Sequence, residues 1–463
     1  MTHSPLQQVI AALTPLLGER ITHNDSIRTQ HSHGEGWMRA NMPEAVLFAR
    51  TTQEVSAIVA QCHAHRVPLV PFGAGTSVEG HVTPPPGAIS LDLSQMTDIL
   101  QVNADDLDCR VQAGVTRQAL NAHLRDMGLF FPVDPGGEAT IGGMCATRAS
   151  GTAAVRYGTM RENVMGLRAV MADGTVVDTG GRVRKSSTGY DLTGLLVGSE
   201  GTLGVITEIQ LRLHGIPETM AAAVCQFPTL DDAVRTAVAI MQMGVPIGRL
   251  ELLDDVQMDA CIRYSALEGY QRLTTLFFEF QGSPASVREQ IAMVEEIAGD
   301  NAGLGFTWSE SQEERTRLWK ARHAAYWAAL AYRPGHHGLA TDAIVPISAL
   351  TELMTGVKED IGRSGLCAPI VGHVGDGNFH TVILVPPEEG GYERALELDR
   401  RIVRRALALG GSCSGEHGIG TGKIEFMEAE HGAPALGVMH AIKHALDPYN
   451  ILNPGKMLPP ALA

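Results

Sequence analysis

The segment PFGAGTSVEG, Pro71–Gly80, is the stretch around which the rest of the chain is interpreted. Its glycines have no Cβ, and Thr76 and Ser77 add two hydroxyls, so the loop can present backbone N–H groups to a phosphate. It is not a Rossmann fingerprint, because Val78 occupies the third glycine position, and it lacks the lysine of a P-loop. By itself the segment is equally compatible with a plain surface turn.

Two further regions rich in small residues favour a ligand. DPGGEATIGG, Asp134–Gly143, continues into more glycines and alanines up to Gly158, and LLVGSEGTLGVIT, Leu195–Thr207, lies at the start of a predicted strand. Backbone with so few side chains suggests a long ligand lying against the chain. Three such loops, each able to approach one extended diphosphate, are hard to explain as turns alone.

Composition narrows the class of protein. The 463 residues are 44% hydrophobic and 19% charged, which is typical of a soluble globular protein of two or three domains. The net charge of −15, with Lys and Arg scattered along the chain, argues against nucleic-acid binding. The seven cysteines occur singly, and neither a membrane span nor a basic leader is recognisable. We therefore expect a cytoplasmic location, with the inner face of the membrane as the alternative.

Hydrophobic periodicity predicts two sheeted domains. A helix over Gln53–Arg66 precedes a short strand and the first glycine loop, and strands are expected in Leu167–Gly180 and Leu203–His214. After Pro217 the pattern changes to β-α-β-β-α-β, with helices near residues 230–243 and 285–299. Helices near 311–331 and 391–409 follow. This pattern indicates a second α+β domain with an antiparallel sheet.

A metal site is suggested by two histidines around a glycine-rich turn. GHVGDGNFH, Gly372–His380, can bring both imidazoles to one cation if the turn reverses the chain. GEHGIG, Gly415–Gly420, offers Glu416 and His417, and two histidines with one carboxylate are a common set for Zn²⁺ or Mn²⁺. The alternative is a polar loop with two solvated histidines.

The motifs, in this order, resemble the FAD-binding domain of vanillyl-alcohol oxidase type flavoproteins. Later motifs narrow the resemblance to the FAD-linked D-lactate dehydrogenase (cytochrome) family, relatives of the glycolate oxidase flavin subunit and of D-2-hydroxyglutarate dehydrogenase. The resemblance extends from about residue 40 to Lys456. These later motifs are LWKARHAAYWAALAYRPG from Leu318, TDAIVPIS from Thr341, GHVGDGNFH from Gly372, GEHGIGTGK from Gly415 and NPGK from Asn453.

The resemblance implies an α+β fold with three parts: an FAD-binding domain of two α+β subdomains over 1–217, a ferredoxin-like antiparallel-sheet cap domain with the metal site over 218–425, and a C-terminal segment, 426–463, that returns to the FAD domain. FAD is expected without a covalent link, because Thr76 stands where some relatives carry the attached histidine. The FAD contacts carried over are Phe72, Gly73, Ala74, Gly75, Thr76, Ser77, Gly80, Asp134, Pro135, Thr140, Gly142, Gly143, Gly151, Ala153, Tyr157, Glu200, Gly204, Ile206 and Asn453.

The resemblance also implies a reaction. The metal ligands would be His373, His380 and Glu416, for Zn or Mn, and His417 would be the general base. Arg322 would pair with the substrate carboxylate, and Asn378 would bind its hydroxyl or carboxylate. The expected activity is oxidation of a D-2-hydroxy acid, with D-lactate favoured, and transfer of electrons to a cytochrome, quinone or electron-transfer flavoprotein. A homodimer, with peripheral membrane association as an option, is expected.

One departure bears on the substrate. D-2-hydroxyglutarate dehydrogenases resemble this chain but carry a basic residue two positions before the Asp of TDAIVP, where this chain has Ala340; His336 and His337 nearby can compensate. Alternatives within the family are a glycolate oxidase flavin subunit or a D-2-hydroxyglutarate dehydrogenase. Outside it, a metal-dependent hydrolase, a non-haem iron oxygenase or a non-catalytic flavin-binding subunit stay open.

Overall fold

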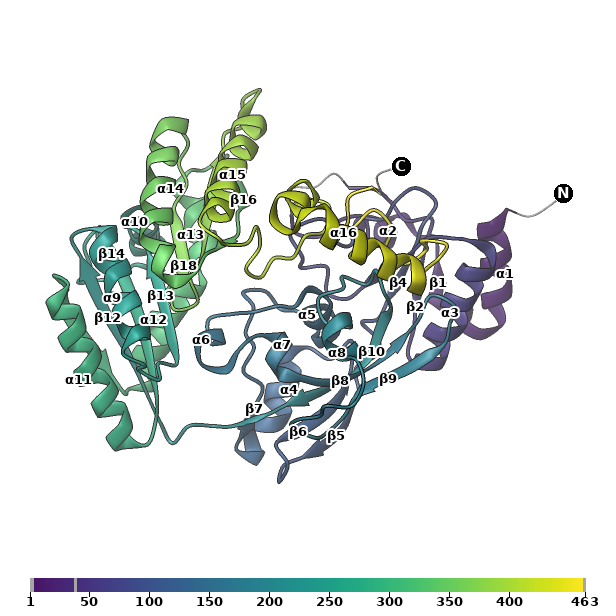
Figure 1. Cartoon of the computed structure of the whole chain (residues 1–463), viewed down its shortest axis with the longest axis horizontal. Coiled ribbons are helices and arrows are strands. Elements are labelled where there is room, and N and C mark those ends of the chain that lie inside the picture. Colours follow the sequence, from purple (N-terminus) through teal and green to yellow (C-terminus); the bar gives the residue numbers. More distant parts are fainter. Residues whose placement is uncertain (1–3, 37–39, 461–463) are drawn as a thin grey trace. The chain divides into compact units, whose positions relative to one another are not determined.

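The computed structural model describes residues 4–36 and 40–460, which divide into two compact units (Figure 1). Unit 1 comprises the described residues of Met1–Ser150, Gly158–Ile216 and Glu416–Ala463, and unit 2 comprises Gly151–Tyr157 and Pro217–Gly415. Among the described helices, none has the length and apolar character needed to cross a membrane.

The first sheet of unit 1 has four strands in the order β1-β2-β4-β3, with β2, β4 and β3 parallel and β1 antiparallel to β2. The predicted helix is confirmed as α3, Thr52–His65, which Thr51 caps by accepting a hydrogen bond from the Glu54 N–H. The parallel strand β3 leads into the first glycine loop, so this loop begins at the carboxyl end of a parallel strand. The strands are β1 Ile21–Thr22, β2 Ala45–Phe48, β3 Leu69–Phe72 and β4 Ile89–Asp92.

The second sheet of unit 1 is antiparallel, in the order β5-β6-β10-β8-β9. The predicted strands are present as the β8–β9 hairpin and as β10. Almost all of β10 is buried, because α3 and α5 pack on the strand. The strands are β5 Ile99–Asn103, β6 Asp108–Gln112, β8 Val164–Val170, β9 Val176–Gly180 and β10 Val205–Arg212.

The other elements of unit 1 are short, apart from two helices. A small sheet pairs β7, Leu129–Phe130, with β11, His214–Gly215. The helices are α1 Pro5–Leu17, α2 Asp25–Gln30, α4 Arg117–Leu124, α5 Ile141–Thr147, α7 Met160–Asn163, α8 Leu192–Leu196 and α16 Met427–Leu446.

Unit 2 is built on one antiparallel sheet in the order β15-β12-β14-β13-β18-β19-β16, with β17 also paired to β19. Its strands are β12 Thr219–Phe227, β13 Arg249–Leu253, β14 Thr274–Gly282, β15 Leu304–Ser309, β16 His337–Ala340, β17 Ala343–Ile344, β18 Ile370–His373 and β19 Asn378–Val385. Its helices are α6 Ala154–Tyr157, α9 Leu230–Gln242, α10 Asp255–Ser265, α11 Pro284–Asp300, α12 Gln312–His323, α13 Ala325–Tyr332, α14 Leu350–Ser364 and α15 Gly391–Ala408.

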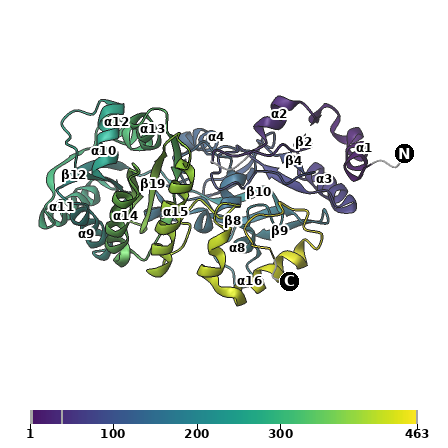
Figure 2. The ribbon, with the colours of Figure 1, turned by 90° about the horizontal axis from the view of Figure 1, so that it is seen from above.

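Helices cover both faces of this sheet (Figure 2). Residues from α9, α11, α14 and α15 form one core with Leu250 and Leu252 of β13, whereas residues from α10, α12 and α13 form another with Leu253. Successive strand residues point to opposite faces. Glu251 therefore lies on the same face as Leu253, under α12.

The predicted helices of unit 2 are mostly confirmed. α9, α11 and α15 lie within two residues of the expected ranges. The pattern missed α14 and α10. The helix α10 begins because Asp254 caps it by accepting a hydrogen bond from the Gln257 N–H. The single helix expected over 311–331 is wrong, because the chain leaves helical geometry at Ala324 and forms α12 and α13. No glycine or proline marks this break.

Candidate functional site

The three predicted metal ligands lie together. His373 ends β18, His380 lies on β19, and Glu416 directly follows Gly415; one ligand atom from each lies within 4.8 Å of the others. The antiparallel register sets His380 opposite Val371 and His373 opposite Asn378, so the glycine-rich turn does reverse the chain. The two imidazole rings, 8% and 7% exposed, have centroids 5.3 Å apart. They are therefore not the solvated histidines of the alternative interpretation.

Each of the two imidazole rings is oriented by a hydrogen bond at its Nδ1. His373 Nδ1 lies 2.7 Å from Glu251 Oε1, and His380 Nδ1 lies 2.9 Å from the Thr341 carbonyl oxygen. Each acceptor favours a proton on Nδ1, and Nε2 is then the nitrogen of each ring that is suited to ligate a cation. Two such nitrogens and a carboxylate fit Zn²⁺ or Mn²⁺.

Arg322 is not a solvated helix residue. It lies on the sheet side of α12, 7% exposed, and its Nη2 donates to Glu251 Oε2. Its Nε is buried and has no hydrogen-bond partner within residues 4–36 and 40–460. The guanidinium therefore keeps donors for a planar anion such as a carboxylate. Burial opposes ionisation of Glu251, but His373 and Arg322 outweigh it and hold its pKa below the ordinary value.

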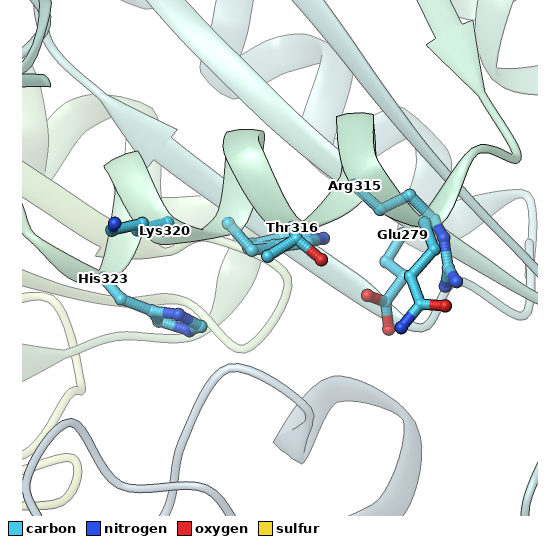
Figure 3. Close-up of a pocket in the computed structure, with 7 residues that line it drawn as sticks. Glu279, Arg315, Thr316, Lys320 and His323 are labelled. Atoms are coloured by element: carbon cyan, nitrogen blue, oxygen red, sulfur yellow. The ribbon is translucent and has the colours of Figure 1, made fainter.

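Other residues of α12 line an open hollow of about 490 Å³ (Figure 3). None of the predicted site residues lines it. Glu279, at its edge, forms an ion pair with Arg249 at 3.3 Å. The lining residues are Glu279, Gln312, Arg315, Thr316, Trp319, Lys320 and His323. The hollow is therefore not lined by Arg322 or Asn378, the predicted substrate-binding residues.

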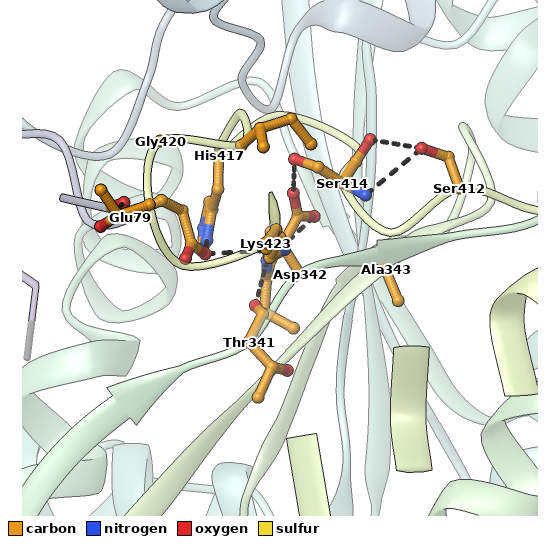
Figure 4. Close-up of polar contacts among 12 residues, drawn as sticks. Glu79, Thr341, Asp342, Ala343, Ser412, Ser414, His417, Gly420 and Lys423 are labelled. Carbon is orange, nitrogen blue, oxygen red and sulfur yellow. Dashed lines mark hydrogen bonds and ion pairs between the residues drawn. The ribbon is translucent and has the colours of Figure 1, made fainter. Parts of the chain in front are cut away.

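Asn378 is more constrained than the sequence suggested. Its Nδ2 donates to Asp342 Oδ1 at 2.8 Å and to the Ala343 carbonyl oxygen at 3.2 Å. Asp342 also accepts from Ser414 Oγ at 2.7 Å (Figure 4). Of the polar side-chain atoms of Asn378, only Oδ1 has no partner in the part of the chain that the structure describes, and this acceptor suits a hydroxyl and not a carboxylate. A Cβ at Gly415 would lie 1.8 Å from Asn378 Nδ2, so glycine is required immediately before Glu416.

His417 lies beside the first glycine loop of unit 1. Its Nδ1 is 3.5 Å from Glu79 Oε1, which is also 3.6 Å from Lys423 Nζ (Figure 4). Burial raises the pKa of Glu79, but Lys423 and His417 outweigh it, so this pKa lies below its ordinary value. The Glu79 carbonyl oxygen accepts the Thr421 N–H at 2.8 Å, and a Cβ at Gly420 would lie 2.1 Å from it. The loop that follows His417 is therefore fixed against Glu79.

Glu200 and Asn453, both predicted as FAD contacts, hold backbone segments together. The Glu200 carboxylate accepts the N–H groups of Ile419 at 2.7 Å and Gly420 at 2.9 Å. Asn453 Nδ2 donates to the carbonyl oxygens of His81 at 3.0 Å and Glu200 at 2.7 Å. Glu200 has a left-handed φ of 54°, which is unusual for a residue with a Cβ. These contacts join four parts of unit 1 around the loop after His417.

The first glycine loop has the unused donors that a diphosphate requires. In the described chain, the backbone N–H groups of Gly73 to Gly80 donate no hydrogen bond, and the buried Ser77 Oγ has no partner. A Cβ at Gly73 would lie 2.5 Å from Thr140 Oγ1, so the first two glycine regions touch. These residues fit the diphosphate of FAD.

The second glycine region contributes differently from the first. The N–H groups of Ile141 and Gly142 donate to carbonyl oxygens at 2.8 Å, and that of Gly143 donates to Thr140 Oγ1 at 3.3 Å. These groups are therefore used within the protein, and Gly142 and Gly143 offer only close backbone approach.

The predicted FAD contacts do not all belong to one unit. Gly151, Ala153 and Tyr157 lie in unit 2, where Tyr157 Oη donates to Gln281 Oε1 at 2.6 Å. The others lie in unit 1, including Asp134, Pro135, Gly204 and Ile206.

Several charged residues around the site were missed by sequence reasoning. They are buried, and each contacts a predicted residue or its loop: Glu79, His81, Glu251, Asp342 and Lys423. One signal was available. A carboxylate inside the apolar strand RLELL is costly to bury unless it is paired, so Glu251 could have been selected from its setting.

The chain matches the model for an FAD binding domain over residues 43–180 and the model for the C-terminal domain of FAD linked oxidases over 216–457. It is 48% identical to a probable mitochondrial D-lactate dehydrogenase of Danio rerio, over 98% of this chain and 92% of the relative. It is 45% identical to a mitochondrial D-lactate dehydrogenase [cytochrome] of Arabidopsis thaliana, over 98% of this chain and 80% of the relative.

The structure of p-cresol methylhydroxylase superposes with a TM-score of 0.79 at 17% identity, over 98% of this chain and 97% of that one. The similarity confirms the predicted α+β fold with a vanillyl-alcohol oxidase type FAD-binding domain.

The expected cytoplasmic location is contradicted. Four relatives, 39% to 48% identical, are described as mitochondrial. The expectation used the single cysteines as a sign of compartment, but burial raises the pKa of thiols such as Cys62 and Cys109 to about 12. Protonated, inaccessible thiols persist in any compartment, so they carried no information about location.

Proposed function

Because the chain belongs to the family of FAD linked oxidases, as an FAD-linked oxidoreductase, we propose that it oxidises a D-2-hydroxy acid, with D-lactate as the best candidate, to the 2-oxo acid with the help of a divalent metal. The observation that carries the proposal is the cluster of His373, His380 and Glu416, with both histidines anchored at Nδ1. The relatives' names support the substrate.

Each residue of the site then has a chemical role. FAD would supply a hydride acceptor, and Zn²⁺ or Mn²⁺ a Lewis acid that favours loss of the hydroxyl proton. Arg322 binds the substrate carboxylate through its remaining donors, and Asn378 Oδ1 accepts from the hydroxyl when the substrate binds, a hydrogen bond that is given up when the proton leaves. His417, one peptide bond beyond Glu416, takes the hydroxyl proton as general base.

The surroundings of Ala340 favour a short substrate. Ala340 pairs with Val382 on β19, two residues from His380 and therefore on the same face. His337 lies on the opposite face, stacked on Tyr392 with ring centroids 6.3 Å apart, so of the two nearby histidines this one is directed away from Ala340. Two apolar side chains suit the methyl group of lactate better than a second carboxylate.

A cytochrome is the proposed electron acceptor, because a relative 45% identical carries that term in its name. Quinone and electron-transfer flavoprotein are the alternatives. The homodimer and the peripheral membrane association stay predictions.

The test is anaerobic reduction of the bound flavin by a panel of D- and L-2-hydroxy acids. D-Lactate should bleach the visible flavin absorption within the time of a single turnover, and L-lactate should not. D-2-Hydroxyglutarate and glycolate should bleach it more slowly than D-lactate. Bleaching by none of the acids would overturn the proposal and favour a non-catalytic flavin-binding subunit. A hydrolase or an oxygenase would likewise leave the flavin oxidised without oxygen.

A further inference from the structure

Glu251 is a carboxylate in the middle of β13, between leucines, and only 1% exposed. The antiparallel register pairs Leu252 with Gly372, so the next pair along sets Glu251 opposite His373. Both side chains lie on the face covered by α12. A carboxylate in such a place is costly unless its oxygens are paired.

The two oxygens of Glu251 serve different partners. Oε1 faces His373 Nδ1 at 2.7 Å, and Oε2 accepts from Arg322 Nη2. One partner is a candidate metal ligand, and the other is the candidate receptor for the substrate carboxylate. A single buried carboxylate therefore joins the two binding functions.

Each partner depends on this contact. For His373, an acceptor at Nδ1 fixes the tautomer and the ring plane in which Nε2 faces a cation. For Arg322, the contact neutralises a buried guanidinium, and it is the only side-chain hydrogen bond of Arg322 among the residues that the structure describes. Because the guanidinium is planar and rigid, the hydrogen bond from Nη2 to Glu251 also fixes the direction of the other N–H donors of Arg322.

We propose that Glu251 is a positioning residue that sets His373 for the metal and Arg322 for the substrate carboxylate, and so couples the two binding events. This inference rests on the proposed function. It predicts that replacing Glu251 impairs metal binding and substrate binding together, although Glu251 touches neither ligand.

The test uses the full-length, FAD-loaded protein and the variants Glu251→Gln and Glu251→Asp. Glutamine keeps the shape without the charge, and aspartate keeps the charge but is too short to reach both partners. The affinity for Zn²⁺ and Mn²⁺, measured by competition with a chromophoric chelator, should fall by about 10- to 100-fold. The KM for D-lactate, at saturating metal, should rise roughly tenfold, with FAD content unchanged.

Asp254→Asn is the matched control. Asp254 directly follows β13, is fully buried, and pairs with Lys358 of α14 at 2.7 Å, on the other side of the sheet. It also caps α10. This variant should lose thermal stability but keep the metal affinity and the KM of the wild type.

The outcomes separate three cases. Folded Glu251 variants with unchanged metal affinity and KM overturn the positioning role. Equal losses in Asp254→Asn, or failure of both Glu251 variants to fold while Asp254→Asn folds, also overturn it, because Glu251 would then serve stability alone. If the wild-type protein binds no metal and oxidises no hydroxy acid, the proposed function itself is wrong, and this result is distinguished by the wild type alone, before any variant is compared.

Discussion

Replacement by alanine should have different effects on metal content at His373, a proposed metal ligand, and at His417, the proposed general base. His373 uses Nδ1 on Glu251 and so offers Nε2 as a ligand, whereas His417 has its Nδ1 3.5 Å from Glu79. His417→Ala should keep FAD and metal but lose about 10²- to 10⁴-fold in kcat. His373→Ala should lose the metal. Metal content by elemental analysis, alongside turnover, checks both. Equal metal loss in the two variants would make His417 a ligand.

Ala340 should control which acid is preferred. Ala340→Arg places a guanidinium beside Val382, on the face of the sheet that carries His380. It should lower kcat/KM for D-lactate and raise that for D-2-hydroxyglutarate, changing their ratio by about tenfold or more, since an ion pair with the distal carboxylate is gained. Steady-state kinetics with both acids measures the ratio. A ratio that does not move would place the substrate side chain elsewhere, and Ala340→Leu controls for size alone.

The helix pair α14–α15 should show an acid-sensitive stability. Asp360 on α14, 4% exposed, accepts from Arg405 of α15 at 3.2 Å through Oδ1, and this hydrogen bond holds its pKa below the ordinary value. A lowered pKa means that the stabilisation is present above about pH 4 and is lost as the pH falls through the folded-state pKa.

Asp360→Asn should therefore destabilise the protein by about 1 to 2 kcal/mol at neutral pH. The difference from the wild type should shrink below about pH 4. Urea unfolding midpoints at neutral and acid pH measure it. A difference that is the same at both values would assign the effect to packing.

The elements that the sequence predicted well are those whose signal is local. The helix α3 has a threonine cap and apolar residues on one face, and the β8–β9 hairpin has Asp173 and Gly174 at its turn. The break at Ala324 and the helix α10 were missed because their cause is not periodic. One depends on a helix ending without glycine or proline, and the other on a single capping aspartate.

The molecule as a whole limits what the sequence can say about the site. His373 and His380 could be selected because they flank one glycine-rich turn, and Glu416 because the motif GEHGIG matches that of the family. Glu251 could not be joined to them, because its partners lie 71 and 122 residues away and meet only through strand register and helix packing. Asn378 was predicted to bind either the hydroxyl or the carboxylate of the substrate. Its contacts with Asp342 and Ala343 use the Nδ2 donor and leave the acceptor Oδ1 for a substrate.

Removal of the metal should leave the flavin bound. The loop Gly73–Gly80 that fits the diphosphate belongs to unit 1, whereas two of the three metal ligands, His373 and His380, belong to unit 2. The glycine loop and the metal ligands are different residues, so chelation changes none of the backbone N–H donors of Gly73–Gly80. We therefore expect full FAD content after chelation and gel filtration, with reduction of the flavin by D-lactate lost.

Adding back Zn²⁺ or Mn²⁺ should restore the reduction, and the ion that restores it at the lower concentration is the better candidate for the resident metal. Chemical reduction by dithionite serves as the control, since it should bleach the flavin with or without metal. Unchanged reduction by D-lactate after complete removal of the metal would contradict the Lewis-acid role, because Arg322 and His417 alone would then suffice for the oxidation.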